Sequence, residues 1–453
     1  MRRSRLPLLL PLLRGLPFAL LAPGVVMGAS ARELPLPQAL GPVAINTVAA
    51  PSDPELRVLL QQAAEIQLQA SGGPLLLRSA DGTQLGTLAP DQVLRLGLDA
   101  TNPGSLMLQG VPVTSASASG AASPEGGLLA LSELWLEPAT AESLIALQQR
   151  SFRGRLRVLR QGEVLLAINH VTLEAYLPSV VGSEMPASWP QPALRAQAVA
   201  ARTYALRQRR RQAAFDLQAT VASQVYKGVG SETPSTREAV AATRGQVLTY
   251  QGSLIEAVFH SSSGGSTEAS GELWAQQLPY LVPVPDFDDH SPVRSWQERF
   301  SPDQLQQLFP ETGGVQALRV TSRSNSGRVR QLRLDGPRGA LSLSGAELRK
   351  RLGLRSTWIE LELLGTAVAL GAAEAPAVLQ GLELPWPPPP PPQVDLQLAP
   401  APLAGLLIRG RGFGHGIGMS QWGAHGLAQR GASYAAILSH YYPGTQLNAF
   451  RDP

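Results

Sequence analysis

The sequence predicts an α+β fold with mixed, largely antiparallel strands, packed helices and a β-rich N-terminal region. Residues 32–165 consist of short apolar runs separated by Gly, Asp and Pro, which is typical of strands joined by tight turns. Residues 192–215 form an alanine-rich stretch of high helix propensity. Hydrophobic residues make up 44% of the chain and charged residues 16%, which is typical of a folded globular protein.

The first 31 residues have the pattern of an export signal. Arg2, Arg3 and Arg5 form a positive n-region, an apolar stretch follows, and residues 29–31 (Ala-Ser-Ala) supply a small-residue cleavage site. The alternative is an uncleaved membrane anchor, which Arg14 and several prolines in the apolar stretch disfavour. We therefore expect an extracytoplasmic protein, in the periplasm or cell wall, that meets the membrane only through an uncleaved leader.

A chain of 453 residues is long enough for more than one domain. After the signal peptide (1–31), we expect a β-rich N-terminal region over 32–149, with a Ser/Gly/Ala linker near 115–127. A core over 150–453 follows, interrupted by a Pro-rich insertion at 366–404.

The charge and the composition exclude several classes of function. Four of the 38 basic residues lie in the leader, which leaves 34 basic residues against 34 acidic ones, so the net charge of +4 gives no argument for nucleic-acid binding. There is no cysteine, which rules out disulfides, thiolate nucleophiles and cysteine-ligated metals.

The N-terminal elements are short. Strands are expected at 73–78 and 92–98, each bounded by turn residues. A hairpin over 152–169, with its turn at Gln161–Gly162, leads into the central part of the chain.

The helix expected over 192–215 begins at Pro192, a residue suited to a first turn. Arg195 and Arg202 are seven residues apart and so share one stripe, about 10.5 Å apart. They are candidates to orient an acid or to bind an acidic substrate. The alternative is that both are ordinary solvated arginines.

The later elements alternate between helices and hairpins. We first expect a helix with a capping box at 235–238 that ends at Gly245, a hairpin of 246–250 with 254–260, and a glycine-rich loop at 261–265. An antiparallel pair over 317–343, around Asp335–Gly336, is followed by a helix with a capping box at 344–347 that runs to Arg351. A polyproline II segment at 385–392 and helices up to 441–444 complete the expected order.

Glu184 is the carboxylate around which the chain is organised. It stands beside Met185 and Pro186, with Trp189 close behind, in a turn expected just before the helix that begins at Pro192. Apolar neighbours raise the pKa of a carboxyl toward the range of a general acid, whereas a helix N-terminus favours the anion. The alternative is a carboxylate that merely caps the helix.

A second candidate region is the stretch 410–418, in which every second residue is glycine. So much glycine is tolerated where positive φ or close approach is needed. His415 lies in its middle and Ser420, Gln421 and Trp422 follow, which suggests a binding loop that forms the other wall of a cleft with Glu184. The alternative is a tight packing turn with a hydrogen-bonded histidine.

Other chemistries are not supported. His260, His290, His415 and His425 are present, but their spacing matches no metal motif and there is no HExxH, so we predict no metal and no cofactor. The GxxxxGK[ST] and GxSxG patterns are also absent, which argues against a phosphate loop and a serine hydrolase.

Several separated motifs resemble one family. They are LEAYLPSVVGSEMPASWPQPALRAQAVAARTYAL (173–206), AVAATRGQVLTYQGSLIEAVFHSSSGGSTE (239–268), LPYLVPV (278–284), LSGAELRKRLGLRSTW (343–358) and GRGFGHGIGMSQWGAHGLAQRGASYAAILSHYYPGT (410–445). In this order they resemble the stage II sporulation protein D / amidase enhancer LytB family. The resemblance covers most of 150–450 apart from the Pro-rich insertion.

The resemblance implies peptidoglycan as partner. Sporulation members of the family are lytic transglycosylases, whose catalytic glutamate corresponds to Glu184, and the family's Lys and Arg correspond to Arg195 and Arg202. Arg195 departs from the family, because a guanidinium has a different geometry from an ammonium. Some members bind zinc through cysteines, which this chain lacks. His415, Ser420, Gln421, Trp422 and Tyr204 would hold the sugars.

The chemistry explains why one acid suffices. Ordinary glycosidases use two carboxylates. A lytic transglycosylase instead uses the C6 hydroxyl of the sugar as nucleophile, so Glu184 serves as acid and then as base and leaves a 1,6-anhydro-muramoyl end. One alternative is a non-catalytic module that stimulates an N-acetylmuramoyl-L-alanine amidase of the cell wall. Another is a wall-anchoring protein that uses the segment 385–392.

Overall fold

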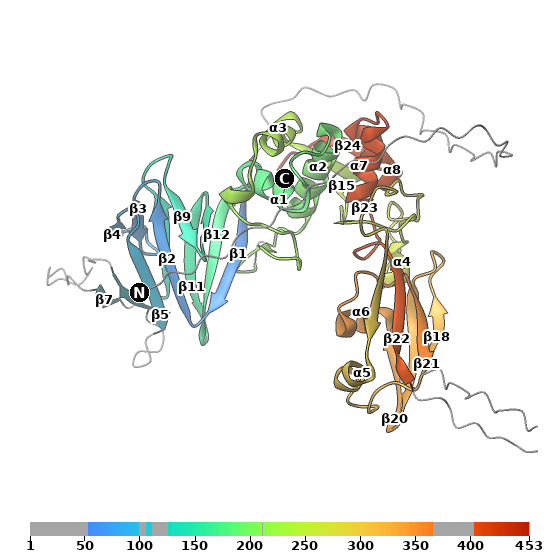
Figure 1. The fold of residues 1–453 in the computed structure, drawn as a ribbon. Helices are drawn as coiled ribbons and strands as arrows, with labels where there is room; N and C mark the ends of the chain where they lie inside the picture. The colour runs from blue at the N-terminus through green and yellow to red at the C-terminus, as the bar shows by residue number, and fades with distance from the viewer. Residues whose placement is uncertain are drawn as a thin grey trace, which may run out of the picture. The chain divides into compact units, whose positions relative to one another are not determined.

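A computed structural model describes residues 53–98, 106–110, 126–129, 131–210, 212–365 and 403–452 (Figure 1). The expected signal peptide, the linker apart from residues 126 and 127, the polyproline segment and residues 366–402 of the insertion lie outside the described residues. The fold is α+β, with several mostly antiparallel sheets and packed helices, as the sequence predicts.

Two sheets form the β-rich N-terminal part. The first has seven strands in the order β13 (Leu217–Gln218), β1 (Glu55–Ala63), β12 (Val164–Thr172), β11 (Arg155–Gln161), β8 (Glu133–Pro138), β3 (Leu75–Arg78) and β4 (Gln84–Leu88). The second has six, in the order β10 (Arg150–Phe152), β9 (Leu144–Leu147), β2 (Glu65–Ser71), β5 (Val93–Leu98), β6 (Leu106–Gln109) and β7 (Gly126–Leu129). Alternate side chains of both sheets enter one hydrophobic cluster, as the period of a strand requires.

The hairpin expected over 152–169 is present as β11 and β12, with Gln161 opposite Val164. Its second strand runs on to Thr172 and leads directly into α1 (Leu173–Glu184). The hairpin therefore delivers the chain to the segment that carries Glu184.

Helix α2 (Gln191–Arg207) packs on α1 and on α3 (Pro234–Ala242). A short 3-10 helix, η1 (Val229–Ser231), precedes α3 in the chain. The alanines of α2 are buried, which permits this close approach. The helix ends eight residues before Phe215, where the sequence placed its end. Asp216 explains the early end, because its carboxylate accepts hydrogen bonds from the Arg210 N–H and from Arg57, and so turns the chain into β13.

The helix α3 differs from the prediction at both ends. Its N-cap is Thr233, whose hydroxyl accepts the Thr236 N–H, and not Ser235. Pro234 accounts for the shift, since proline is suited to the first helical position. The helix ends at Ala242 and not at Gly245.

The hairpin after α3 is shorter than expected. β14 (Gln246–Tyr250) pairs with β15 (Ser253–Leu254) on one edge and with β24 (Gln446–Ala449) on the other. The chain then leaves this sheet, because residues 259–260 form β16 (Phe259–His260) and pair in parallel with β23 (Met419–Ser420). This pairing brings the end of the glycine-rich stretch beside residues 259–260.

A second hydrophobic cluster holds together residues 295–365 and 403–411. Its sheets are β17 (Ser295–Phe300), β22 (Leu403–Arg411) and β21 (Ile359–Gly365), and β18 (Ala317–Arg323), β19 (Val329–Gly336) and β20 (Gly339–Ser344). The expected antiparallel pair over 317–343 thus contains three strands. Helices α5 (Pro302–Leu308) and α6 (Gly345–Leu352) cap it, and the predicted capping box of Ser344 with Glu347 is confirmed.

The C-terminal part contains α7 (Gln421–Gln429) and α8 (Tyr434–Tyr441), which precede β24. Helix α4 (Ser270–Leu273) is a single turn. Within the residues that the structure describes, none of the helices is both long and apolar enough to span a bilayer.

Candidate functional site

Glu184 is the last residue of α1, and not part of a turn just ahead of α2 as the sequence suggested. This position changes the expected charge of the Glu184 side chain. The C-terminal end of a helix carries partial negative charge, so this position disfavours the carboxylate, whereas the expected position would have favoured it. The alternative reading of Glu184 as a helix N-cap does not fit this position.

Each of the two carboxylate oxygens of Glu184 accepts one hydrogen bond. Oε1 accepts the backbone N–H of Val225 at 3.1 Å, and Oε2 accepts Nε2–H of Gln421 at 3.1 Å. Burial raises the pKa of Glu184 above its ordinary value, while these two bonds and the positive charge of Lys227 lower it in part. A carboxyl with a raised pKa that is still partly open to solvent is suited to give and to take a proton.

Trp422, the residue after Gln421, belongs to an aromatic cluster. The rings of Trp189 and Trp422 meet edge to face with centroids 4.7 Å apart, and His425 lies 4.7 Å from Trp189 and 5.5 Å from Trp422. Trp189 and Trp422 are partly exposed. Partly exposed aromatic rings are a common surface for binding a sugar, because their faces take up its C–H groups.

The glycine-rich stretch places Gln421 and Trp422. At Gly414 and Gly418 φ is positive, and a Cβ at Gly418 would meet the Val258 carbonyl oxygen at 2.2 Å. Ser420 is fully buried and its hydroxyl accepts the Gly423 N–H at 3.1 Å, which caps α7. The loop therefore fixes the start of α7, and with it the side chain that contacts Glu184.

His415 braces this loop. Its Nδ1 accepts the Ile417 N–H at 3.0 Å and its Nε2 lies 3.0 Å from the Phe259 carbonyl oxygen. Burial lowers the pKa of His415 to about 4, so the ring is neutral at neutral pH and Nε2–H donates to Phe259. Both ring nitrogens are occupied by backbone, as in the tight turn that the sequence left open as an alternative.

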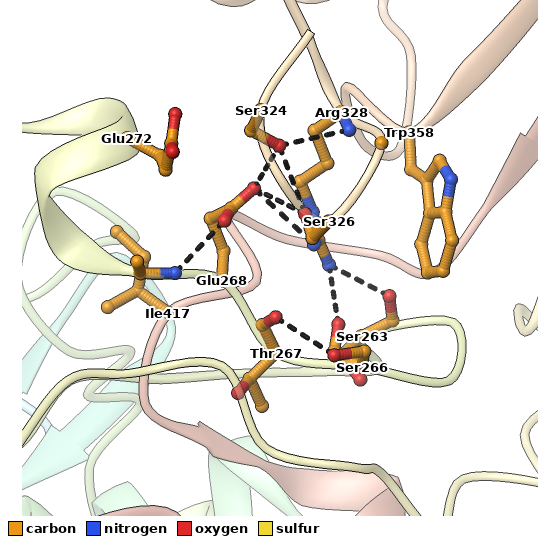
Figure 2. Close-up of polar contacts among 12 residues, drawn as sticks. Ser263, Ser266, Thr267, Glu268, Glu272, Ser324, Ser326, Arg328, Trp358 and Ile417 are labelled. Atoms are coloured by element: carbon orange, nitrogen blue, oxygen red, sulfur yellow. Dashed lines mark hydrogen bonds and ion pairs between the residues drawn. The ribbon is translucent and has the colours of Figure 1, made fainter.

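A buried polar network holds the glycine-rich stretch in place (Figure 2). Glu268 and Arg328 are 0% and 2% exposed and form an ion pair, and the hydroxyls of Ser324 and Ser326 donate to the same Glu268 oxygen. The Glu268 backbone N–H donates to the Gly416 carbonyl at 2.8 Å. Arg328 also donates to the carbonyls of residues 263 and 266. These contacts tie the glycine-rich stretch, through Glu268, to Arg328, the residue just before β19.

Arg202 is placed differently from the expectation. It is fully buried and forms a two-bond ion pair with Glu174, at 2.7 and 2.9 Å, and it donates to the carbonyls of Val240 and Gln246. Among the described residues its partners do not include Glu184. Arg202 therefore holds α1, α2 and β14 together, where the sequence suggested a role in orienting the acid or binding substrate.

Arg195 and Tyr204 lie on the same helix as Arg202. Arg195 is partly exposed and forms an ion pair with Glu238 at 3.3 Å. Tyr204 is partly buried against the main core, and burial raises its pKa. A role for either in binding substrate stays a prediction.

Two groups at Glu184 were not predicted from the sequence. The Val225 amide acts through its backbone, which leaves no sequence signal. Lys227 is one of only two lysines in the chain, a rarity that singles it out without indicating a role. Among the residues that the structure describes, no group of three or more His, Cys, Asp or Glu side chains is placed to hold a metal ion.

The segment that carries Glu184 is also the part of the chain that matches a family model. The family model described as "Stage II sporulation protein" (SpoIID) matches residues 161–250, which include Glu184. Stage II sporulation protein D of Bacillus amyloliquefaciens is 31% identical over 303 residues, which cover 62% of this chain and 76% of that protein. The chain belongs to the SpoIID family.

Two Bacillus subtilis relatives carry different names. Stage II sporulation protein D of that organism is 30% identical over 302 residues, or 62% of this chain and 76% of that protein. The protein named "Amidase enhancer" is 34% identical over 291 residues, or 60% of this chain, yet this alignment spans only 40% of the enhancer.

Proposed function

We propose that this SpoIID-family chain cleaves the glycan strands of peptidoglycan as a lytic transglycosylase, with Glu184 as its single acid and base. The observation that carries the proposal is the environment of Glu184. Burial raises the pKa of the carboxyl, and Gln421 donates to it. Trp422, the residue after Gln421, pairs with Trp189. Among the described residues, the charged side chain that shifts the pKa of Glu184 is that of Lys227, and not a second carboxylate.

The reaction needs only one carboxyl. Protonated Glu184 gives its proton to the glycosidic oxygen as the bond from that oxygen to C1 breaks. That C1 belongs to a muramoyl residue, whose own C6 hydroxyl then bonds to C1. The hydroxyl proton passes to the Glu184 carboxylate, which restores the acid. The product has a 1,6-anhydro end, and no water is consumed.

Three groups act on the charge of Glu184 during this cycle. The Val225 amide, the Gln421 amide and the Lys227 ammonium all favour the carboxylate, which exists between the two proton transfers. Burial favours the acid form that begins the cycle. The balance between them keeps both forms accessible.

The second candidate function is stimulation of a cell-wall amidase without cleavage of glycan. It is favoured by one observation, the 34% identity with a protein named "Amidase enhancer". In either case the chain works on the cell-wall side of the membrane, because its N-terminal pattern is that of an export signal.

Product analysis separates the two functions. The purified protein and its Glu184→Gln variant are incubated with glycan strands free of stem peptides, and the products are analysed by mass spectrometry. We expect anhydro-muramoyl ends from the wild type and at least about a hundredfold less from Glu184→Gln. The matched control is Glu163→Gln, which replaces a glutamate whose side chain is 92% exposed and should match the wild type. No anhydro ends from the wild type, together with a faster amidase in its presence, would establish the enhancer function instead.

A further inference from the structure

A hollow of about 490 Å³ lies in the β-rich N-terminal part, and its lining includes none of the residues at Glu184. Most of the lining belongs to β2 and to the turn between β9 and β10, which are strands of one sheet. Along β2 the side chains of Ile66, Leu68 and Ala70 are buried, so the polar side chains between them face away from the core. Six polar residues line this glutamine hollow: Gln61, Glu65, Gln67, Gln69, Gln148 and Gln149.

The glutamine amides of the hollow are available to a ligand. Within the described residues, none of the five forms a side-chain hydrogen bond with the protein. Gln61 follows a β-bulge in β1, which re-aims the side chains after it, and its Oε1 is buried without a donor. A buried acceptor without a donor is unfavourable, so a ligand that supplies an N–H at Gln61 removes this cost.

The turn between β9 and β10 is strained. Leu147 pairs with Arg150, so Gln148 and Gln149 are the two central residues of a tight hairpin turn. Their φ angles are 49° and 63°, in the left-handed region that this turn requires and that Asn-Gly adopts most easily. Glutamine has a Cβ that disfavours this region, yet both residues line the hollow. Backbone strain persists where side chains are needed in one place, so the turn points to a binding role.

The spacing along β2 fits a peptide. Glu65, Gln67 and Gln69 are alternate residues of one strand and so follow one another at about 6.7 Å. An extended peptide presents the N–H and C=O of every second residue on one edge, with the same spacing. A glutamine amide has a donor and an acceptor in one plane and can pair with both groups. Gln67 and Gln69 therefore match two alternate residues of an extended peptide.

The charge of the lining comes from one carboxylate. Glu65 is exposed and is the charged residue of the lining, and within the described part of the chain it forms no ion pair. Arg95 of β5 lies opposite Gln67 in the ladder but does not line the hollow. Since Glu65 stands in one row with the two amides, it faces the backbone of the same ligand. A backbone group that carries positive charge is an amino terminus.

We propose that the glutamine hollow binds the amino-terminal end of an extended peptide. The terminal ammonium lies at Glu65, and the N–H and C=O of the third and fifth residues lie at Gln67 and Gln69. Gln61 and the two turn glutamines supply further amides around the ligand. The inference goes beyond the proposed function, because the ligand is a peptide and not the glycan strand that Glu184 would cleave.

The test uses the full chain with nitrogen-15 in its glutamine side-chain amides, observed by NMR at pH 6.5, where an α-amino group is protonated. The probes are penta-alanine amide with a free amino terminus, the same peptide with an acetylated amino terminus, and N-acetylglucosamine. The Gln67→Ala variant assigns the Gln67 signal. We expect the free peptide to shift this signal and to bind about fivefold more tightly than the acetylated peptide, because acetylation removes the charge that pairs with Glu65. N-acetylglucosamine should leave the signal in place.

Two variants separate the charge from the rest of the site. Glu65→Gln keeps the size of the side chain and should abolish the preference for the free amino terminus. The matched control is Glu163→Gln, which changes a glutamate that is 92% exposed outside the lining and should keep the preference. Equal binding of the two peptides by the wild type, a preference that persists in Glu65→Gln, an unmoved Gln67 signal, or an equal shift with N-acetylglucosamine would each overturn the inference.

A third variant tests the strained turn. Gln148→Asn combined with Gln149→Gly supplies the residues that this turn favours, so thermal stability should stay the same or rise. The affinity for the free peptide should fall at least about threefold, because two amides of the lining are lost. A variant that is at least as stable and binds the peptide as tightly as the wild type would contradict the binding role of the turn. These readouts need no cleavage of glycan, so loss of the transglycosylase proposal would leave them unchanged.

Discussion

Glu184 combines a largely buried position with a hydrogen-bond donor at each of its two carboxylate oxygens. Val225 is 41 residues away in sequence and Gln421 is 237 residues away. Each donor stabilises the carboxylate, and burial opposes them, so the pKa of this carboxyl depends on their balance. The structure thus gives a specific way to change the protonation of the acid without removing it.

Replacing Gln421 by Leu tests this balance. The side-chain amide lowers the pKa of Glu184, so its loss raises that pKa further. In the proposed mechanism activity requires the protonated acid and falls as pH rises through this pKa, so the alkaline limb of the kcat/KM profile should move to higher pH. We expect kcat at neutral pH to fall about tenfold, because the carboxylate formed after the first proton transfer loses a donor. A limb that stays in place or moves to lower pH would contradict the assignment of Glu184 as the acid.

At the scale of the element, two arginines on one helix have opposite roles. Arg202 of α2 is fully buried with Glu174, whereas Arg195 of the same helix forms an exposed pair with Glu238. Breaking a buried pair leaves an uncompensated charge in the core, but an exposed pair contributes little. The two positions therefore form a matched comparison.

Arg202→Ala should lower the free energy of unfolding by about 3–5 kcal/mol, and Arg195→Ala by less than about 1 kcal/mol. Urea denaturation followed by circular dichroism measures both. Similar small losses at the two positions would show that the Arg202–Glu174 pair does not hold α1 and α2 together.

These elements also show what could be read from the sequence. The hairpin β11–β12, the alanine-rich α2 and the capping box of α6 follow from turn residues, propensity and a local side-chain pattern. The early end of α2 does not, because it depends on Asp216 bonding to Arg57, 159 residues away in sequence. The burial of Arg202 was missed for the same reason, since its partners lie on α1, on α3 and at Gln246.

The candidate site divides in the same manner. Glu184, Gln421 and Trp422 were indicated by their motifs, and Gln421 does contact Glu184. His415 and Ser420 stood out in the same motif, but their side chains serve the loop and the cap of α7. A sequence pattern shows that a histidine sits between glycines, but not whether its ring nitrogens face a ligand or backbone.

At the scale of the whole molecule, the glycine-rich stretch joins the two hydrophobic clusters. It begins at the end of β22, whose residues pack in the second cluster, and it ends at β23 and α7, whose residues pack in the main one. Glu268 and Arg328 hold it between these ends. The position of Gln421 against Glu184 thus depends on contacts made far from the acid.

Arg328→Met should therefore loosen the loop. The change leaves Glu268 buried without its cation, and we expect a loss of about 3–5 kcal/mol in the stability of this region. Amide hydrogen exchange over 412–420 should quicken, while exchange in β11 and β12 stays as in the wild type. Unchanged exchange over 412–420 would mean that the network does not hold the loop.

In the proposed reaction Glu184 transfers protons between oxygens of the glycan, and water is not the nucleophile. Cleavage of glycan strands in water labelled with heavy oxygen tests it most directly, with the new ends analysed by mass spectrometry. We expect anhydro-muramoyl ends without heavy oxygen from the wild type, and none above background from Glu184→Gln. New reducing ends that carry heavy oxygen, or anhydro ends that persist in Glu184→Gln, would contradict it.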